Sequence, residues 1–270
     1  MGELSGLHIV VTRPQRQAEA WAAQLSRMGA RTTVIPLLEI VPVSDERQIQ
    51  AIKNLILDFD LYRKAIFVSQ NAVEQGFEWL ENYWPQLPMG VEFFAVGDTT
   101  ARQLQARGVR VTDLAQSQTG AMTSETLLES PALQSVAGEK IIIFRGVGGR
   151  PHIGETLRAR GAQVDYCELY ERLLPAQSPM AFEHLLVSRP EPNVMVLHSG
   201  EALENLHKIV RQMTVKVPQS MVNMQLLVPS QRIEELARAA GFINVFAAQN
   251  ATEASMLQGL IDLRPNLGSM

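Results

Sequence analysis

The chain of 270 residues has a single cysteine, Cys167, and this scarcity excludes several classes of site. One thiol can form neither an intramolecular disulfide nor a thiolate cluster for zinc or an iron–sulfur centre. We interpret Cys167 as a small buried hydrophobe, because its strand-like setting offers no neighbouring base that would activate a nucleophile. The 5 histidines show no i, i+4 pairing, so the sequence predicts no metal site.

Long apolar runs are also missing. The longest, such as 141–144 and 194–197, are strand-sized, whereas a membrane-spanning helix needs about 20 apolar residues. The first residues lack the basic start and apolar core of a signal peptide, so we expect a cytoplasmic protein. A net charge of −4 argues against a general nucleic-acid binder. Its length allows two ordinary domains or one large one, and 46% apolar residues can fill the cores.

What the chain does contain is a repeat, at an offset of about half its length. Each copy has strand-like segments that end in polar residues and helical patterns that close on glycine. The matched landmarks, in the same order in both copies, are Arg13 and Arg145, Gly29 and Gly161, Ser69 and Ser199, and Gly108 and Gly241. Agreement of this kind indicates two copies of one structural unit.

Short apolar strands alternate with amphipathic helices in both copies. The predicted apolar faces comprise Ala18, Trp21, Ala22, Leu25 and Met28, then Val73, Phe77, Leu80 and Trp84, and finally Ile233, Leu236, Ala237 and Ala240, with Ser230 as N-cap. This alternation predicts an α/β class with parallel sheets covered on both faces. Ligands bind beyond the carboxyl ends of such strands, so we expect two polar rims to face one cleft.

Two motifs that suggest other chemistries fail on spacing. The glycine-rich turn 146–150 has Pro151 where the third glycine of a dinucleotide fingerprint is required, so nucleotide binding is disfavoured. Ser199 follows His198, but Leu197 occupies the first glycine position of a hydrolase nucleophile elbow. Because Ser69 in the other copy has no histidine nearby, a hydroxyl that binds an anion or a carboxylate is the better shared role.

Tyr170 lies in an extended segment that leads to Pro175, and the matched segment of the first copy leads to Pro42. Two interpretations of Tyr170 remain open. It is either an amphipathic packing residue at a boundary or a phenol placed over the cleft as a proton donor.

Together, these segments resemble the uroporphyrinogen-III synthase family. The segments that carry the resemblance are 10–14, 67–73, 95–101, Arg145-Gly146 and 199–203, and the likeness runs from about residue 7 to residue 260. The chain departs from the family at Pro229-Ser230-Gln231-Arg232, where many relatives carry a Gly-Pro-Thr-Thr type of turn. Ser230 keeps a hydroxyl there, whereas Gln231 is a doubtful binder.

The resemblance implies two similar parallel-sheet α/β domains, flavodoxin-like or HemD-like, with one inserted in the other through a two-stranded linker. The implied first domain is discontinuous, 1–37 with 174–270. The second is 42–168, and the linker strands are 38–41 and 169–173. Such a hinge permits the domains to open and close around a large substrate.

The implied activity is that of a cyclising hydro-lyase of tetrapyrrole and heme biosynthesis. Hydroxymethylbilane, a chain of pyrroles rich in carboxylates, becomes uroporphyrinogen III with inversion of ring D and loss of water. The pyrrole itself supplies the electrons that expel the hydroxyl, so the resemblance implies no cofactor. As partners we expect the small-molecule substrate and a transient contact with the upstream deaminase, but no nucleic acid and no membrane; the protein is expected to be a monomer.

The resemblance assigns to Tyr170 the role of the family tyrosine that assists departure of the hydroxyl. The expected substrate-binding positions are Ser69, Asn71, Thr100, Ser199, Gly200 and Ser230. To these the repeat adds Arg13 and Arg145, since guanidinium groups pair well with carboxylates. A different class of function stays open beside the enzyme, a non-catalytic two-domain binder of small polycarboxylates.

Overall fold

The computed structural model of the protein describes residues 2–112, 124–187, 192–212 and 224–267. The chain forms two compact units: unit 1 is Met1–Glu39 with Leu173–Met270, and unit 2 is Ile40–Arg172. Unit 2 is thus inserted in unit 1, as the predicted fold class requires. No helix within the described ranges is both long and apolar enough to cross a membrane.

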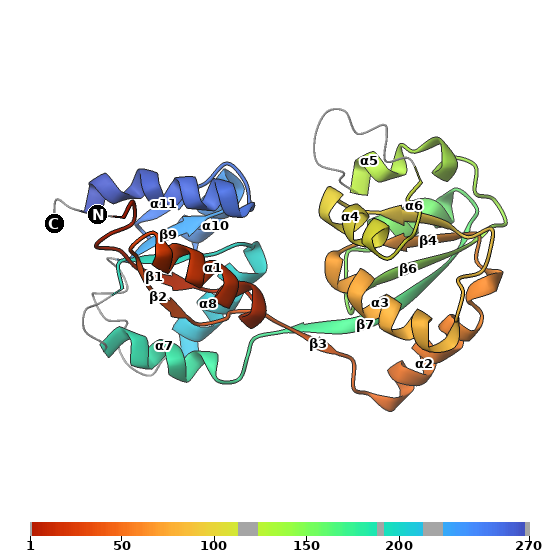
Figure 1. Cartoon of the computed structure of the whole chain (residues 1–270), viewed down its shortest axis with the longest axis horizontal. Helices are drawn as coiled ribbons and strands as arrows, with labels where there is room; N and C mark the ends of the chain where they lie inside the picture. The colour runs from red at the N-terminus through yellow and green to blue at the C-terminus, as the bar shows by residue number, and fades with distance from the viewer. Residues whose placement is uncertain (1, 113–123, 188–191, 213–223, 268–270) are drawn as a thin grey trace. The chain divides into compact units, whose positions relative to one another are not determined.

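Unit 1 is a five-stranded sheet in the order β10-β9-β8-β1-β2, and its pairings are parallel. Read from its other edge, this is the 2-1-3-4-5 order of flavodoxin-like folds. The strands are β1 (His8–Val11), β2 (Arg31–Val34), β8 (Val194–Val196), β9 (Gln225–Val228) and β10 (Val245–Ala247). Helices cover both faces (Figure 1), which explains why the central strands β1 and β8 are buried throughout.

One face of this sheet packs against α1 (Gln15–Arg27) and α11 (Glu253–Leu267). The other packs against α7 (Ser178–Val187), α8 (Gly200–Gln212) and α10 (Gln231–Ala239). The apolar face predicted for α1 is confirmed, because Ala18, Trp21, Ala22 and Leu25 are its buried residues. The prediction for α10 is wrong at one position: Leu236 is 48% exposed, while its neighbours in the pattern are buried.

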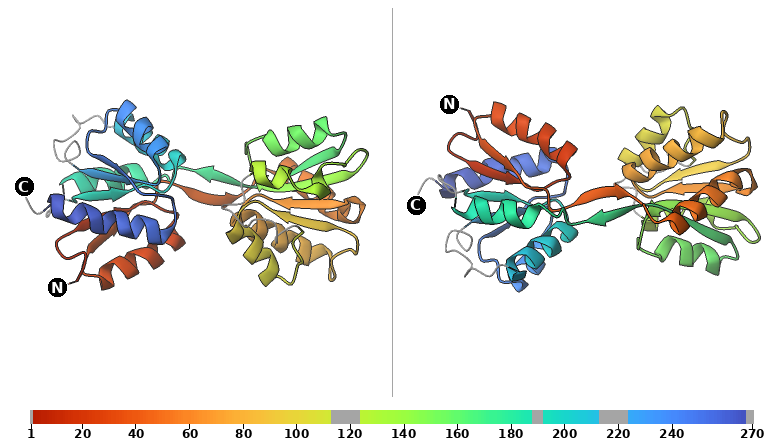
Figure 2. Two further views of the ribbon diagram at one scale, coloured as in Figure 1. Left: turned by 90° about the horizontal axis from the view of Figure 1, so that it is seen from above. Right: turned by 90° about the horizontal axis from the view of Figure 1, so that it is seen from below.

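Unit 2 has a second five-stranded sheet, in the order β3-β7-β6-β4-β5. Its strands are β3 (Glu39–Pro42), β4 (Lys64–Phe67), β5 (Glu92–Ala95), β6 (Lys140–Gly146) and β7 (Gln163–Leu173). The pairings of β6 with β4 and β7, and of β4 with β5, are parallel. The chain passes between the units in β3, which is the edge strand, and in its neighbour β7 (Figure 2). These two segments overlap the predicted linker strands.

Apolar clusters lie on both faces of this sheet as well. The cluster on one face includes α2 (Glu46–Leu57), the short η1 (Phe59–Leu61), α3 (Gln70–Tyr83) and α4 (Asp98–Ala106). The other includes α5 (Ser124–Leu128), η3 (Pro131–Leu133) and α6 (His152–Ala159). Helix α3 approaches closely at Gly76, where a Cβ would lie 3.0 Å from Phe67 Cε1.

The strand orders agree with the repeat predicted from the sequence. Strand β1 lies between β2 and β8, just as β6 lies between β7 and β4. The helices that follow β1 and β6 end at Gly29 and Gly161, whose φ angles are 95° and 88°. In unit 1 the strands that follow β1 and β8 are added on opposite sides of this central pair. In unit 2 the same holds for the central pair β4 and β6. These two positions are the topological switch points where open α/β sheets bind ligands.

Candidate functional site

At the switch point of unit 2, two predicted site residues form a hydrogen bond. Ser69 follows β4 and caps α3, and its Oγ accepts the Ala72 N–H at 3.1 Å. The same Oγ lies 2.8 Å from the Tyr170 hydroxyl, and either atom could be the donor. Tyr170 projects from β7 and is only 1% exposed, while Ser69 is half-buried. The serine is therefore the accessible end of the pair.

The ring of Tyr170 reaches Ser69 by crossing Gly146 on the intervening strand β6. A Cβ at Gly146 would lie 2.6 Å from Tyr170 Cε2, so the ring fits only over a residue without a side chain. The register between β6 and β7 shifts here, pairing Arg145 with Glu168 but Gly146 with Tyr170. This irregularity is typical of bulges that re-aim a side chain near a site.

Arg145, expected to bind a substrate carboxylate, is instead engaged inside unit 2. Its guanidinium donates to the Gly149 carbonyl at 2.5 Å, pairs with Glu168 at 3.2 Å, and lies 4.1 Å from the centre of the Tyr166 ring. The side chain is 7% exposed. The buried guanidinium, paired with Glu168, therefore holds the 146–150 turn in place; its expected contact with a substrate carboxylate stays a prediction.

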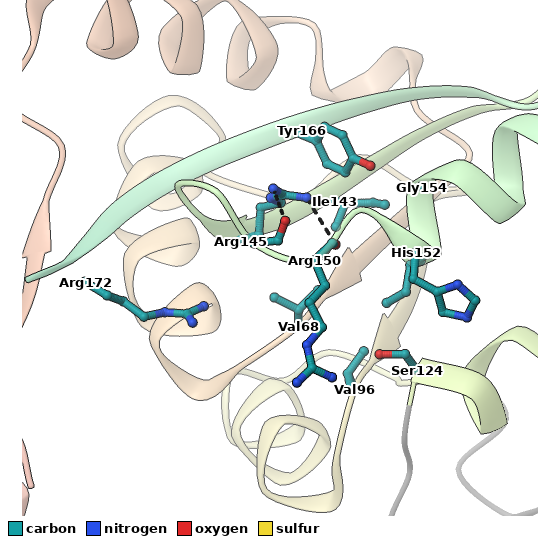
Figure 3. A pocket seen from close by; sticks show the side chains of 12 residues that line it. Val68, Val96, Ser124, Ile143, Arg145, Arg150, His152, Gly154, Tyr166 and Arg172 are labelled. Carbon is teal, nitrogen blue, oxygen red and sulfur yellow. Dashed lines mark hydrogen bonds between the residues drawn. The ribbon is translucent and has the colours of Figure 1, made fainter. Parts of the chain in front are cut away.

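A cavity of about 290 Å³ opens beside this turn, at the carboxyl ends of β4, β5 and β6. Val68, Val96 and Ile143 form apolar lining (Figure 3), and Arg150, His152 and Arg172 are among its polar residues. Sequence reasoning missed these three residues. The signal that could have found the first two is their position at the end of the glycine-rich turn 146–150 and at the start of the helix that follows it.

The other predicted residues of unit 2 differ in their accessibility. Asn71 lies half-buried in the first turn of α3, close to Ser69. Thr100 is 2% exposed, because it is on the buried face of α4. The expectation that its hydroxyl binds substrate stays a prediction, and the exposed hydroxyl of that turn belongs to Thr99.

At the switch point of unit 1, Thr12 and Arg13 follow β1. The Thr12 hydroxyl donates to the Val196 carbonyl at 2.7 Å, which ties the ends of β1 and β8 together. Arg13 pairs with Glu253 of α11 at 2.6 Å, and its side chain is 20% exposed. Unlike Arg145, Arg13 is held by a largely exposed carboxylate, and such pairs are weak.

Ser199 in unit 1 repeats the capping role of Ser69. Its Oγ accepts the Ala202 N–H at 3.1 Å at the start of α8, whose first residue is Gly200. Ser230 occupies the N-cap position of α10, as predicted, but its side chain makes no capping hydrogen bond. All three lie half-buried at the carboxyl ends of β8 and β9.

His198 is an unusual neighbour of these residues. Neither ring nitrogen has a hydrogen-bond partner among the described residues, and the same is true of Trp21 Nε1. The two rings meet edge to face with centroids 4.9 Å apart. Burial, together with the charge of Arg13, lowers the pKa of His198 to about 3, so its imidazole is neutral at pH 7.

Cys167 is a buried residue of strand β7 in unit 2. Burial raises the pKa of its thiol, with a further contribution from Glu168. A protonated, buried thiol is a poor nucleophile. The structure thus fits its interpretation as a packing residue.

Comparison with known proteins gives a consistent result. The family model described as uroporphyrinogen-III synthase HemD matches residues 19–258. The uroporphyrinogen-III synthase of Escherichia coli K12 is 33% identical over 258 residues, which covers 94% of this chain and 100% of the relative. The enzyme of Salmonella typhimurium LT2 is 31% identical over the same shares.

Solved structures agree on the fold. A mutant uroporphyrinogen III synthase of Thermus thermophilus superposes with a TM-score of 0.63 at 17% identity, covering 97% of this chain and 100% of that one. The Helicobacter pylori 26695 uroporphyrinogen-III synthetase gives a TM-score of 0.58 at 16% identity, covering 96% and 100%. From the family model and the similarity over nearly the whole sequence, the chain belongs to the uroporphyrinogen-III synthase family.

Proposed function

We propose that this protein cyclises hydroxymethylbilane to uroporphyrinogen III, with inversion of ring D and loss of water, as a step of heme biosynthesis. Family membership over almost the full chain supports the reaction. The observation that carries the chemistry is the hydrogen bond between Ser69 and Tyr170 at a switch point of a parallel sheet.

The reaction asks little covalent chemistry of the protein. The C–O bond to the terminal hydroxyl breaks as the electron pair of the pyrrole nitrogen moves into the ring system, and the hydroxyl leaves as water once it receives a proton. The resulting electrophilic carbon bonds first to the α carbon of ring D that already carries a methylene bridge. The bond between ring D and that bridge then breaks and re-forms at the free α carbon, whose proton is released, and ring D is thereby inverted. Protein groups need only hold the folded substrate and supply that proton.

In this proposal Ser69 and Tyr170 form the proton source. Because Tyr170 is 1% exposed, its phenol reaches substrate through the half-buried Ser69 hydroxyl. Ser69 gives its proton to the departing hydroxyl and takes the proton of Tyr170, which leaves a phenolate that is reprotonated later. A phenol is a far better acid than an aliphatic hydroxyl, so the relay lets a buried acid act at the surface of the unit.

Carboxylates of the substrate are bound at other strand ends. The first turns of α3 and α8 present backbone N–H groups that lack partners within the helix, together with Asn71, Ser199 and Gly200. The uncommitted hydroxyl of Ser230 adds a donor. Arg13 can exchange Glu253 for a substrate carboxylate at small cost, because Glu253 is largely exposed.

The proposal extends to the setting of the reaction. Hydroxymethylbilane closes spontaneously to the type I ring, so an enzyme that intercepts it should act close to the deaminase that makes it. We place the protein in the cytoplasm, as a monomer that meets this deaminase transiently. Cross-linking of the two proteins during turnover tests the contact, and sedimentation tests the monomer.

Isomer analysis tests the proposed function. The protein is incubated with hydroxymethylbilane generated by a deaminase, and the oxidised products are separated by chromatography. Type III product in excess over a control without the protein supports the proposal. Type I product alone contradicts it, and tight binding of the substrate under those conditions would favour the non-catalytic polycarboxylate binder.

A further inference from the structure

The cavity of unit 2 carries arginine side chains and a histidine that the proton relay does not use. Arg150, His152 and Arg172 line it together with Arg145. No aspartate or glutamate is among the described residues of its lining. Arg145 is neutralised by Glu168, but the exposed Arg150 guanidinium contributes positive potential to the cavity.

Arg150 is the cation best placed to meet a ligand. Its side chain is exposed and extends past Val68 towards Val96 and Ser124 (Figure 3). Within the described parts of the chain, no hydrogen bond or ion pair occupies its guanidinium. Its backbone, by contrast, is held, because Arg145 donates to the Arg150 carbonyl at 3.4 Å.

The wall behind Arg150 is closely packed. Two guanidinium groups contact the Tyr166 ring, with Arg145 at 4.1 Å and Arg158 at 4.8 Å from its centre. The Tyr166 hydroxyl lies so close to Gly154 that a Cβ there would be 2.1 Å away. Helix α6 begins at His152 without a side-chain cap, so its first N–H groups remain available at the cavity.

The size of the cavity limits what can enter. Its volume of about 290 Å³ lies just below the roughly 300–1,000 Å³ of sites for drug-sized ligands. One substituted pyrrole fits that space, whereas a tetrapyrrole does not. The apolar residues Val68, Val96 and Ile143 suit the face of such a ring, and Arg150 suits an acidic arm.

We propose that this cavity is a subsite for one pyrrole of the substrate and that Arg150 binds its carboxylate arm. The inference rests on the proposed function and deepens it. Ser69 and Tyr170 do not line the cavity, but two of its lining residues adjoin them: Val68 precedes Ser69 in the chain, and the Arg172 guanidinium lies 5.9 Å from the centre of the Tyr170 ring. Occupation of the subsite therefore determines which part of the substrate lies near Ser69, and Arg150 becomes a specificity-determining residue.

The test compares Arg150→Gln with a matched control, Arg63→Gln. Arg63 is exposed and directly precedes β4, at the end of the strand away from the cavity. Loss of a charge-assisted hydrogen bond should raise the KM for hydroxymethylbilane at least about tenfold in Arg150→Gln, with kcat nearly unchanged. Arg150→Lys should recover part of the loss, because it keeps the charge but not the fork of donors.

Equal KM values for wild type and Arg150→Gln would overturn the subsite. A rise in KM that is equally large in Arg63→Gln would also overturn it, because it would indicate general electrostatic attraction. A second measurement separates this inference from the proposed function. Uroporphyrin III is titrated by fluorescence, and Arg150→Gln should bind it at least about tenfold more weakly than Arg63→Gln does. If wild type yields only type I product, the proposed function fails, and the titration alone then decides the subsite.

Discussion

The hydroxyl of Ser69 lies 2.8 Å from the phenolic oxygen of Tyr170, although the two residues are 101 positions apart in the chain. Three strands fix this contact. Ser69 ends the β4 segment, Tyr170 projects from β7, and Gly146 on β6 leaves the space that the ring crosses. A single hydrogen bond thus depends on the register of the whole central sheet.

Gly146→Ala should disturb this contact directly. The new methyl would lie 2.6 Å from Tyr170 Cε2, so the ring must move away from Ser69. We expect the free energy of unfolding to fall by about 1–3 kcal/mol and kcat to fall as well. Urea denaturation and isomer-resolved turnover measure the two effects.

Gly108→Ala is the matched control for that substitution. Gly108 has a φ of 76° and no atom within 4 Å of a built Cβ. Alanine there should cost about 1 kcal/mol of stability through backbone strain and leave kcat unchanged. If Gly146→Ala behaved like this control, close packing of Tyr170 over Gly146 would not matter for turnover.

Arg145→Met should destabilise unit 2. It removes the ion-pair partner of Glu168, which keeps only the Gly148 N–H, and leaves the Gly149 carbonyl without the donor that Arg145 supplies. Breaking a buried pair costs about 3–5 kcal/mol, and because Glu168 is 34% exposed we expect about 2–3 kcal/mol. Arg145→Met combined with Glu168→Gln should recover part of this loss.

The comparison for that prediction is Arg107→Met, which removes an ion pair with the exposed Glu81. Such surface pairs contribute roughly 0–1 kcal/mol. Equal losses of unfolding free energy in the two arginine variants, measured by chemical denaturation, would show that Arg145 does not hold the turn.

His198 predicts an acid sensitivity of unit 1. Its pKa is lowered to about 3 in the folded protein, below the usual 6.5. Between pH 3 and pH 6.5 the imidazole is therefore protonated mainly in the unfolded state. Stability from this residue is therefore complete above pH 6.5 and falls as the pH drops towards 3, by at most about 1.4 kcal/mol per pH unit. His198→Phe keeps an aromatic ring beside Trp21 and should remove this dependence.

Denaturation of wild type and His198→Phe from pH 7 to pH 4 measures the difference. The gap in unfolding free energy should shift in favour of the variant as the pH falls. A gap that stays constant across that range would mean that the imidazole titrates equally in the folded and unfolded states.

Much of the fold follows from local rules in the sequence. Gly29 and Gly161 adopt the positive φ that a helix end requires, and Ser69 and Ser199 cap helices with equal 3.1 Å bonds. The exception is Leu236, which continues a helical apolar pattern beyond the buried face of its helix. Periodicity gives the direction of a side chain but not the extent of the surface that covers it.

The site was less predictable, because partners from other strands decide what each residue does. Arg13 and Arg145 hold equivalent places in the repeat, yet one meets exposed Glu253 and the other is buried against Glu168. Thr100 follows a strand end as expected but is on the inner face of its helix. Arg150 belongs to no recognised binding motif, and only the cavity that it lines identifies it as a candidate binding residue.

A double-mutant cycle on the pair at the switch point tests the central claim most directly. Turnover to type III product is measured for Tyr170→Phe, Ser69→Ala and the double variant, with Asp45→Ala as a control that removes only the α2 cap. If the two hydroxyls form one relay, each single change slows kcat about tenfold to hundredfold and the double variant is hardly slower. Independent, multiplying losses, or an unchanged rate in Tyr170→Phe, would contradict the relay.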